Sequence, residues 1–292
     1  MAQDNGTSMS GKVVVITGGN AGIGKEAAVS LARKGATVVF TARNAERGRA
    51  ALQEIRDRVD GAEVDVMDLD LGILASVHRF AADVLDRFDR LDVLLNNAGL
   101  ILSQRTETED GFEATFGVNH LGHFALTNRL LDRLRANPDG ARIVNVSSGA
   151  HKGARRGLDF DDLQSERRYN GSAVYSRSKL ANVLFTRELS RRLVDDAVTA
   201  NALHPGFVRS EFGRDGDARG PYALGLRLAA PFAISPEKGA RTSVYLASSP
   251  EVEGLTGGYF YKCRPARPSR AASDDEAARR LWGVSQELVG TA

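Results

Sequence analysis

The sequence predicts an α/β protein with a doubly wound parallel sheet of about seven strands, helices on both faces and a single domain. Short runs rich in β-branched residues alternate with longer stretches of helical periodicity, which is typical of βαβ units. The 292 residues are 42% hydrophobic and 26% charged, which is enough to bury one large core. No internal repeat and no linker rich in Pro, Gly or Ser divides the chain. We therefore expect one domain over residues 1–292.

The predicted strands are hydrophobic runs of four to seven residues. They are Val13–Thr17, Thr37–Thr41, Ala62–Asp68, Leu91–Asn96, Arg142–Ser147, Val198–Leu203 and Gly258–Tyr261. Helices are expected where apolar residues recur with helical spacing between these strands. They are Gly24–Lys34, Glu46–Val59, Leu74–Phe88, Phe112–Arg135, Val174–Leu193 and Pro236–Ala247.

Two long segments interrupt this alternation. Residues 149–171 are polar and charged, and residues 211–235 combine several glycines with apolar side chains. Long irregular insertions in a compact α/β domain generally line or cover a binding site. We expect residues 211–235 to form a lid over the substrate.

The two ends of the chain differ in character. Residues 1–10 are polar and are predicted to be a loose N-terminus. Residues 263–292 are predicted to be a C-terminal extension, with a short helix over Asp274–Leu288 that packs Leu281 and Trp282 onto the body.

Composition excludes several classes of function. The formal net charge of +2 gives no electrostatic attraction to nucleic acid. A single cysteine, Cys263, permits no intrachain disulfide and fits a reducing compartment, where it is expected to be an unpaired, buried thiol. There is no signal-peptide pattern and no apolar run long enough for a membrane anchor, so a cytoplasmic location is expected. Arginine outnumbers lysine 32 to 7, as in bacterial proteins from GC-rich genomes.

The histidines do not predict a metal site. His120 and His123 are three residues apart on a predicted helix, but no third ligand is suggested nearby, so packing or helix hydrogen bonding is favoured. His151 follows a predicted strand, and the sequence leaves open whether it lines a substrate site or faces water.

A glycine-rich segment after the first strand predicts a phosphate-binding turn. Val13–Thr17 leads into Gly18-Gly19-Asn20-Ala21-Gly22-Ile23-Gly24 and then a helix. Glycines in this context let the backbone approach a phosphate and point helix amides at it. A nucleoside-triphosphate loop is disfavoured, because Glu26 stands where that loop needs a Ser or Thr for magnesium. A Rossmann-type dinucleotide site is favoured.

The residue after the second strand predicts which dinucleotide binds. Arg43 stands where an acidic residue would accept hydrogen bonds from a free ribose 2′-hydroxyl. A guanidinium would instead pair with a 2′-phosphate. The sequence therefore favours NADP(H) over NAD(H).

A tyrosine and a lysine on one helix face predict proton transfer. Tyr175 and Lys179 are four residues apart, so their side chains lie within reach of each other. A free phenol titrates near pH 10, and a neighbouring ammonium stabilises its phenolate. Such a pair is weak evidence by itself and gains its weight from the residues around it.

With these motifs in the right order, the chain resembles the short-chain dehydrogenase/reductase family over nearly its whole length. The resemblance is carried by Thr17 to Gly24, Asn96-Asn97-Ala98-Gly99, Asn119, Ser147-Ser148, Tyr175 with Lys179, and Pro205-Gly206. It implies that Tyr175 is the general acid/base, Ser148 binds the carbonyl oxygen, Lys179 binds the nicotinamide ribose, and Asn119 helps to hold a water. The expected cofactor contacts are Gly18, Asn20, Gly22, Ile23, Gly24, Arg43, Asp70, Leu71, Asn97, Ala98, Gly99, Tyr175, Lys179, Pro205, Gly206 and Val208.

Within that family the closer likeness is to the retinol dehydrogenase branch. It rests on Asn119-His120-Leu121-Gly122-His123-Phe124, Ser178 to Asn182, His204-Pro205-Gly206 and Leu281-Trp282. The resemblance implies an oxidoreductase that interconverts a carbonyl and an alcohol. Arg43 favours NADP(H) as its cofactor, and the apolar side chains in and beside the predicted lid favour a fairly apolar small molecule as its substrate. The alternative is a non-catalytic NADP(H)-binding regulator. Members of the family often form dimers or tetramers, and the sequence does not distinguish a homo-oligomer from a monomer.

Overall fold

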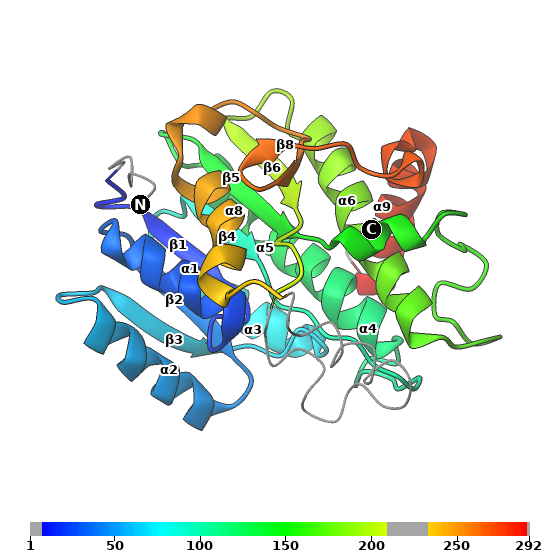
Figure 1. Ribbon diagram of the computed structural model, residues 1–292, viewed down its shortest axis with the longest axis horizontal. Helices are drawn as coiled ribbons and strands as arrows, with labels where there is room; N and C mark the ends of the chain where they lie inside the picture. The colour runs from blue at the N-terminus through cyan, green and yellow to red at the C-terminus, as the bar shows by residue number, and fades with distance from the viewer. Residues whose placement is uncertain (1–7, 209–232, 291–292) are drawn as a thin grey trace.

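The computed structural model describes residues 8–208 and 233–290, and in them eight strands form one sheet in the order β3-β2-β1-β4-β5-β6-β7-β8 (Figure 1). The first seven strands are parallel, and β8 runs antiparallel to β7. The strands are β1 (Val13–Ile16), β2 (Thr37–Ala42), β3 (Val64–Asp68), β4 (Val93–Asn96), β5 (Ala141–Val146), β6 (Val198–Leu203), β7 (Tyr259–Tyr261) and β8 (Arg264–Pro265). The predicted doubly wound α/β domain is confirmed.

The helices cover both faces of the sheet. On one face lie α1 (Gly22–Arg33), α2 (Ala45–Arg58) and α8 (Pro236–Ser248), and on the other α3 (Leu74–Arg87), α5 (Gly122–Arg135) and α6 (Gly171–Arg192) (Figure 1). The strand sequences explain this arrangement. In β1, Val13 and Val15 enter the core beneath α3, α5 and α6, whereas Val14 and Ile16 enter the core beneath α1 and α8. A strand covered on both faces has no position for an exposed polar residue.

The helix predicted over Phe112–Arg135 is divided. It consists of α4 (Ala114–Phe116), a π-helical turn η1 (Gly117–Leu121) and α5. The Glu113 carboxylate accepts the backbone N–H groups of Thr115 and Phe116 at 2.9 and 2.7 Å, and so sets the start of α4. Periodicity could not reveal the π-helical turn, because an extra residue in one turn leaves the apolar spacing on either side unchanged.

A short hairpin ends the sheet, and the sequence did not predict its second strand. Lys262 and Cys263 connect β7 to β8 with φ angles of 52° and 58°. Such a two-residue turn with positive φ suits the twist of a hairpin, but it is normally signalled by Asn or Gly. Cys263 is a free thiol, as predicted, but it is only partly buried, and burial raises its pKa.

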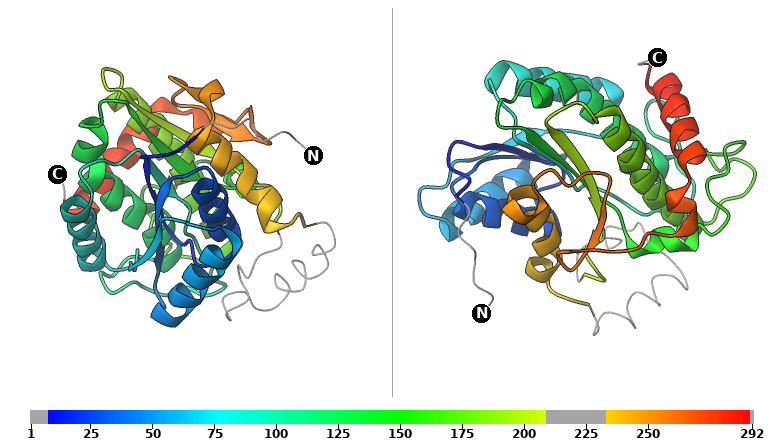
Figure 2. Two further views of the ribbon diagram at one scale, coloured as in Figure 1. Left: turned by 90° about the vertical axis from the view of Figure 1, so that its left-hand side faces the viewer. Right: turned by 90° about the horizontal axis from the view of Figure 1, so that it is seen from above.

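The C-terminal extension packs against the body as predicted. Its helix α9 (Asp275–Val289) runs alongside α6 (Figure 2) and buries Leu281 and Trp282. The centre of the Trp282 ring lies 5.0 Å from that of Phe124 and 5.8 Å from that of Phe185. The extension therefore covers the apolar side chains that α5 and α6 turn away from the sheet.

The remaining predicted segments are only partly described. Most of the predicted lid at 211–235 lies outside the described residues, as do residues 1–7 of the predicted loose N-terminus. Met9 is buried, and its N–H donates to the Lys34 carbonyl at 2.7 Å, so this residue is held against the body.

Candidate active site

The glycine-rich turn lies where the strand order reverses. β1 and β4 are neighbours at the centre of the sheet, and the chain leaves them for opposite sides. Such a switch point, at the carboxyl ends of the strands, is where α/β proteins bind ligands. A Cβ on Gly24 would lie 2.3 Å from the carbonyl oxygen of Gly18, and Gly18 itself has a φ of 67°. Only glycine fits these positions, so the turn exposes its backbone at the start of α1.

The side chains of Thr17 and Asn97 hold the glycine turn in place by hydrogen bonds that the sequence did not predict. The Thr17 hydroxyl accepts the N–H groups of Asn97 and Ala98 at 2.9 and 3.0 Å. The Asn97 side chain donates back to the carbonyls of Thr17 and Gly18 at 2.9 and 3.2 Å. Asn97, a predicted cofactor contact, thus uses its side-chain amide to join β4 to the glycine turn.

His123 continues this network towards Asn119. Because the Thr17 hydroxyl already accepts two N–H groups, its proton is available to His123 Nε2, 2.9 Å away. The other ring nitrogen, Nδ1, then donates to the Asn119 carbonyl at 3.1 Å. Burial lowers the pKa of His123 to about 4 and keeps the ring neutral. The sequence favoured packing or helix hydrogen bonding for this histidine, which the contact with the Asn119 carbonyl confirms, but it gave no indication of the contact with Thr17.

The triphosphate-loop alternative does not match the geometry. Lys25 Nζ contacts Glu54 at 2.6 Å, and Glu26 is paired with Arg58 through two contacts of 2.7 Å. Both side chains therefore join α1 to α2. Neither the lysine nor the carboxylate is directed to a phosphate at the glycine turn.

Arg43 lies next to the glycine turn, as its predicted role requires. It follows β2 directly and is exposed. Two residues earlier, Thr41 accepts the N–H of Gly18 with its hydroxyl and the N–H of Gly19 with its carbonyl, both at 3.1 Å. The end of β2 is thereby fixed against the turn, and the guanidinium is carried at that edge. Asn20, Gly22 and Ile23 of the turn are only partly exposed.

Two of the predicted cofactor contacts, Asp70 and Leu71, have different surroundings. Asp70 and Leu71 follow the end of β3 at Asp68. The Asp70 carboxylate accepts the N–H of Gly72 at 2.8 Å, and the residue remains partly exposed. Leu71 is buried in the core, with its carbonyl close to the backbone of Gly122. Leu71 can therefore reach a cofactor only through its backbone.

Asn119 lies in the π-helical turn η1, and its side chain is fully engaged. Its Oδ1 accepts the N–H of Leu100 at 2.8 Å, and its Nδ2 donates to the Leu100 carbonyl and to Ser178 Oγ at 2.9 and 3.0 Å. A Cβ on Gly99 would lie 3.1 Å from Asn119 Oδ1 and 3.2 Å from Lys179 Nζ. The loop after β4, Asn119 and Lys179 thus meet at one point.

The two serines after β5 have different surroundings. Ser147 is buried, and its hydroxyl donates to the Lys179 carbonyl at 2.7 Å. Ser148 is partly exposed, and its Oγ accepts the N–H of Ala150 at 3.1 Å, which leaves the hydroxyl proton for another acceptor. Of the two hydroxyl protons, that of Ser148 is therefore the one available to a bound oxygen atom.

Tyr175 and Lys179 share one face of α6, the helix that Asn170 caps by accepting the N–H of Ala173 at 2.9 Å. Lys179 is buried, and its Nζ lies 5.8 Å from the centre of the Tyr175 ring. Its hydrogen-bond acceptor is the Val146 carbonyl, at 3.1 Å, and no carboxylate among the described residues forms an ion pair with it. Burial lowers the pKa of Lys179 to about 8.

The turn after β6 completes this edge of the sheet. Pro205 and Gly206 follow His204, and Gly206 has a φ of 95°. His204 Nδ1 accepts the N–H of Gly206 at 3.1 Å, while its ring stacks on Tyr261 with 4.0 Å between ring centres. Val208 pairs with Ile234 and packs near Gly239 of α8.

Two further histidines, His120 and His151, are buried and have structural partners, whereas His78 is partly exposed beside Arg129. His120 contacts Ser285 of α9 through Nε2 at 2.8 Å, and burial lowers its pKa to about 3. His151 is buried, so of the two possibilities left open by the sequence, the one in which it faces water is wrong. Among residues 8–208 and 233–290, no group of three or more His, Cys, Asp or Glu side chains is arranged to hold a metal ion. In that same part of the chain, no helix has the length and hydrophobicity needed to span a membrane.

Comparisons with known proteins agree with this geometry. A family model described as short chain dehydrogenase matches residues 12–159. Human retinol dehydrogenase 13 is 46% identical over 96% of this chain and 85% of its own length, and human retinol dehydrogenase 12 is 46% identical over 96% and 87%.

Solved protein structures also resemble this chain over most of its length. A protein of Mycobacterium paratuberculosis described as uncharacterised has a TM-score of 0.78 and 37% identity, covering 97% of this chain and 95% of its own. The Pseudomonas aeruginosa RhlG/NADP active-site complex has a TM-score of 0.69 and 26% identity, covering 88% and 97%.

Proposed function

The chain belongs to the short-chain dehydrogenase family, and from this premise we propose that it is an NADP(H)-dependent oxidoreductase with Tyr175 as its general acid/base. Membership makes the protein an oxidoreductase that interconverts carbonyl and alcohol groups. The observation that carries the finer proposal is the pairing of Tyr175 with Lys179, a buried cation whose acceptor is a backbone carbonyl. A phenolate beside it would supply the missing negative charge.

The glycine turn fits the diphosphate of a dinucleotide. The clash that a Cβ on Gly24 or Gly19 would cause shows that the turn is closely packed, with backbone in place of side chains. Amides at the start of α1 face the end of β1, where an anion is favoured. The bound cofactor would supply or accept the hydride. Lys179 and Tyr175 would hold the nicotinamide ribose, and the Pro205-Gly206 turn would lie beside the ring.

In our proposal the protein's own groups move the proton and hold the reacting oxygen. During reduction, Tyr175 would donate its proton to the substrate oxygen, and Ser148 would donate a hydrogen bond to the same atom. The Ala150 N–H fixes Ser148 Oγ, and Lys179 would stabilise the phenolate that remains on Tyr175. Asn119 would contribute by fixing Leu100 and η1 around Lys179, since its side chain is fully engaged.

Preference for NADP(H) is proposed from Arg43. The side chain is exposed beside the glycine turn, where a guanidinium can pair with a 2′-phosphate. The named NADP complex among the similar structures supports the same cofactor. Exchange of Arg43 for Asp should shift the ratio of kcat/KM for NADPH over NADH by about 100-fold towards NADH. An unchanged ratio would contradict the proposal.

We propose that the substrate is a fairly apolar small molecule. The retinol dehydrogenases among its relatives are named for an apolar alcohol, and Phe207, 44% exposed, stands directly before the predicted lid. The cytoplasmic location and the homo-oligomer remain predictions.

The test is turnover with a panel of aldehydes, ketones and alcohols on aliphatic, aromatic and sugar scaffolds, followed by NADPH absorbance. Tyr175→Phe should lower kcat by about 1,000-fold while NADPH still binds. Tyr245→Phe, which removes a hydroxyl from α8, is the matched control and should retain activity. Binding of NADPH without turnover of any substrate by the wild-type protein would favour the non-catalytic regulator. Preference for sugar substrates would contradict the apolar class.

A further inference from the structure

His151 makes an unusual set of contacts directly behind Ser148. The side chain is fully buried, and its Nδ1 lies 2.7 Å from the Ser148 carbonyl oxygen. The backbone N–H of His151 donates to the same oxygen at 3.1 Å. Ser148 is thus held at two atoms, its carbonyl by His151 and its Oγ by Ala150.

The other ring nitrogen reaches a distant part of the chain. The N–H of Ser269 donates to His151 Nε2 at 3.0 Å. Because Nε2 accepts a backbone N–H, the ring proton must be on Nδ1, where it can be donated to the Ser148 carbonyl. A neutral imidazole of one tautomer therefore joins the two backbones, and burial, which lowers the pKa of His151, favours that neutral form.

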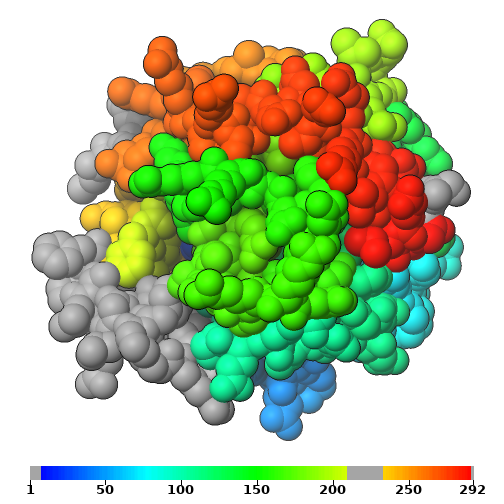
Figure 3. All heavy atoms as spheres, turned by 90° about the vertical axis from the view of Figure 1, so that its right-hand side faces the viewer, coloured from blue at the N-terminus to red at the C-terminus, as the bar shows by residue number. Residues whose placement is uncertain are grey.

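The Ser269 end of this link is itself anchored. Ser269 caps the short helix η5 (Arg270–Ser273), its Oγ accepting the N–H of Ala272 at 3.3 Å. Ala272 is buried, and α9, which follows η5, packs on α6. In Figure 3 these C-terminal residues, orange to red, lie beside the green segment that contains the loop after β5. The extension thus contacts both the Ser148 loop and the helix that carries Tyr175.

Aromatic rings close the remaining side of the imidazole. The Tyr259 ring lies edge-on to His151 at 5.0 Å between centres, and His204 stacks at 6.1 Å on the same tyrosine. The Tyr259 hydroxyl oxygen also lies 3.4 Å from His151 Nδ1. The imidazole cannot turn without breaking these polar contacts or moving the tyrosine ring.

We propose that His151 is a positioning residue, which fixes the peptide of Ser148 from behind and connects it to the C-terminal extension through Ser269. The inference rests on the proposed function, because it concerns how Ser148 is oriented for a substrate oxygen. Small displacements of a positioned group are costly, since a shift of about 1 Å can lower a rate about 100-fold.

Ser269 allows one hydrogen bond to be removed at a time. Its φ of −69° is that of proline, so Ser269→Pro deletes the N–H that His151 accepts and keeps the local backbone angle. Ser269→Pro also loses the hydroxyl cap, and Ser269→Ala, which keeps the N–H, is the matched control for that loss. We expect kcat to fall about tenfold in Ser269→Pro and less than about twofold in Ser269→Ala, with KM for NADPH unchanged in both. Equal kcat values for the two variants would overturn the proposal.

A double-mutant cycle separates positioning from general damage. His151→Asn retains a donor near the Ser148 carbonyl but loses the acceptor for Ser269, and His151→Leu loses both. We expect kcat to fall about 100-fold in His151→Leu, with partial recovery in His151→Asn. In a Ser148→Ala background, the same His151 changes should have almost no further effect on kcat.

Full additivity of the His151 and Ser148 effects would overturn the inference. Thermal unfolding identifies any His151 variant that fails to fold, and the Ser269 pair then decides the question. If the wild-type protein turns over none of the panel, the proposed function fails first. If it is active and the effects are additive, only the positioning role fails.

Discussion

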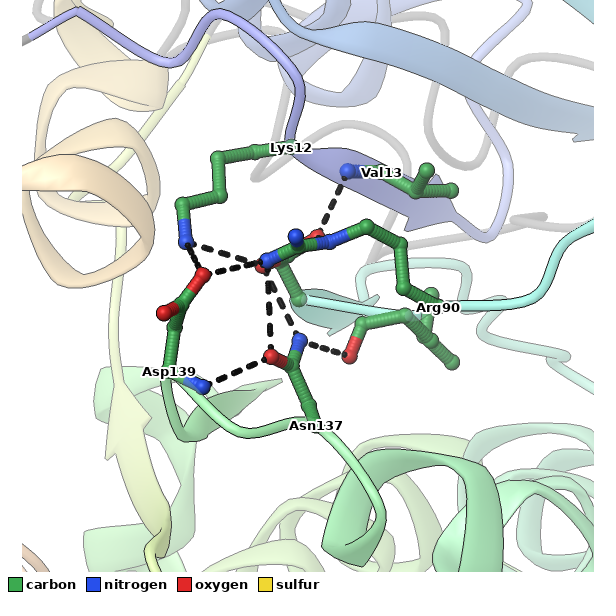
Figure 4. A network of polar contacts seen from close by, with 7 residues as sticks. Lys12, Val13, Arg90, Asn137 and Asp139 are labelled. Atoms are coloured by element: carbon green, nitrogen blue, oxygen red, sulfur yellow. Dashed lines mark hydrogen bonds and ion pairs between the residues drawn. The ribbon is translucent and has the colours of Figure 1, made fainter.

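Two polar clusters lie at opposite ends of the same parallel strands. In one the buried charge is neutralised by ion pairs, and in the other it is not. At the amino ends of β1, β4 and β5, Asp92 accepts the N–H of Val13 at 2.8 Å and side-chain donors from Arg90 and Asn137 (Figure 4). Lys12 and Asp139 complete this network. Burial opposes the ionisation of Asp92, but the hydrogen bonds outweigh it and lower its pKa.

At the carboxyl ends, Lys179 is equally buried but lacks such compensation. Its acceptor is a backbone carbonyl, and burial lowers its pKa to about 8. A buried cation without a counter-charge is costly to the folded state and is typical of functional sites. The network around Asp92 therefore holds strands together. Lys179, in contrast, is a buried cation without an ion-pair partner among the described residues, at the place where we propose that the Tyr175 phenolate forms.

The largest expected effect comes from removing the unpaired cation. Lys179→Met should lower kcat by about 1,000-fold, because the phenolate of Tyr175 loses its stabilising charge. The free energy of unfolding at pH 7 should not fall, since a buried charge is replaced by an apolar chain of similar length. Steady-state kinetics and denaturant unfolding measure the two quantities. Lys238→Met, at an exposed position of α8, is the control, and a strongly destabilised Lys179→Met would contradict the comparison.

The opposite result is expected at the other end of the strands. Asp92→Ala should lower the free energy of unfolding by about 3 kcal/mol, because Arg90 and Lys12 lose one of the two carboxylates that they share and the Val13 N–H loses its acceptor. Turnover should stay within about twofold of wild type below the melting temperature. Urea unfolding with kinetics on the same sample tests both. A large loss of kcat with unchanged stability would contradict a purely structural role for Asp92.

The two clusters should also respond oppositely to pH. The folded-state pKa of Lys179 is lowered from 10.5 to about 8, so its penalty is fully present below pH 8 and is relieved as pH rises towards 10.5. Between pH 8 and 10 the wild type should therefore gain about 2 kcal/mol relative to Lys179→Met. The stability that Asp92 contributes is present above its ordinary pKa of 3.8 and is lost as pH falls below it. Unfolding curves of wild type and each variant across these ranges decide whether both signs are right.

The smallest expected effects come from adding one methyl group, as a glycine-to-alanine change, at each end of the strands. In Gly99→Ala the new Cβ would press on Asn119 Oδ1 and Lys179 Nζ, so kcat should fall about tenfold. In Gly140→Ala, where φ is 76° and the Cβ would lie 2.6 Å from the Ala197 carbonyl, stability should fall by about 1 kcal/mol or more and kcat should persist. Kinetics and melting temperatures of the pair test this. Equal effects of both changes on kcat would remove the distinction.

Local signals predicted much of this molecule. Most strands could be predicted because they are buried hydrophobic runs, and the glycine turn because strand, glycines and helix follow one another. Ser148, Tyr175 and Lys179 were predicted from motifs, and the structure brings Tyr175 and Lys179 to one face of α6 beside the strand end that leads to Ser148.

What the sequence missed depends on contacts between distant segments. The π-helical turn at Asn119 leaves periodicity intact, and β8 needs the unusual angles of Lys262 and Cys263. One hydrogen-bond partner of His123, Thr17, lies 106 residues away, and one partner of His151, Ser269, lies 118 residues away. No spacing rule relates such residues before the chain is folded, so a histidine that joins two backbones looks like any other buried histidine.

The contact between Ser269 and His151 also imposes an order on biosynthesis. All strands from β1 to β7 precede Ser269 in the chain, so they leave the ribosome first. A nascent chain can therefore pair its central strands and form the glycine turn before Ser269 has been synthesised. Until then, His151 Nε2 has no Ser269 N–H to accept. The nucleotide-binding half would mature early during translation, and the half that handles the carbonyl would be completed late.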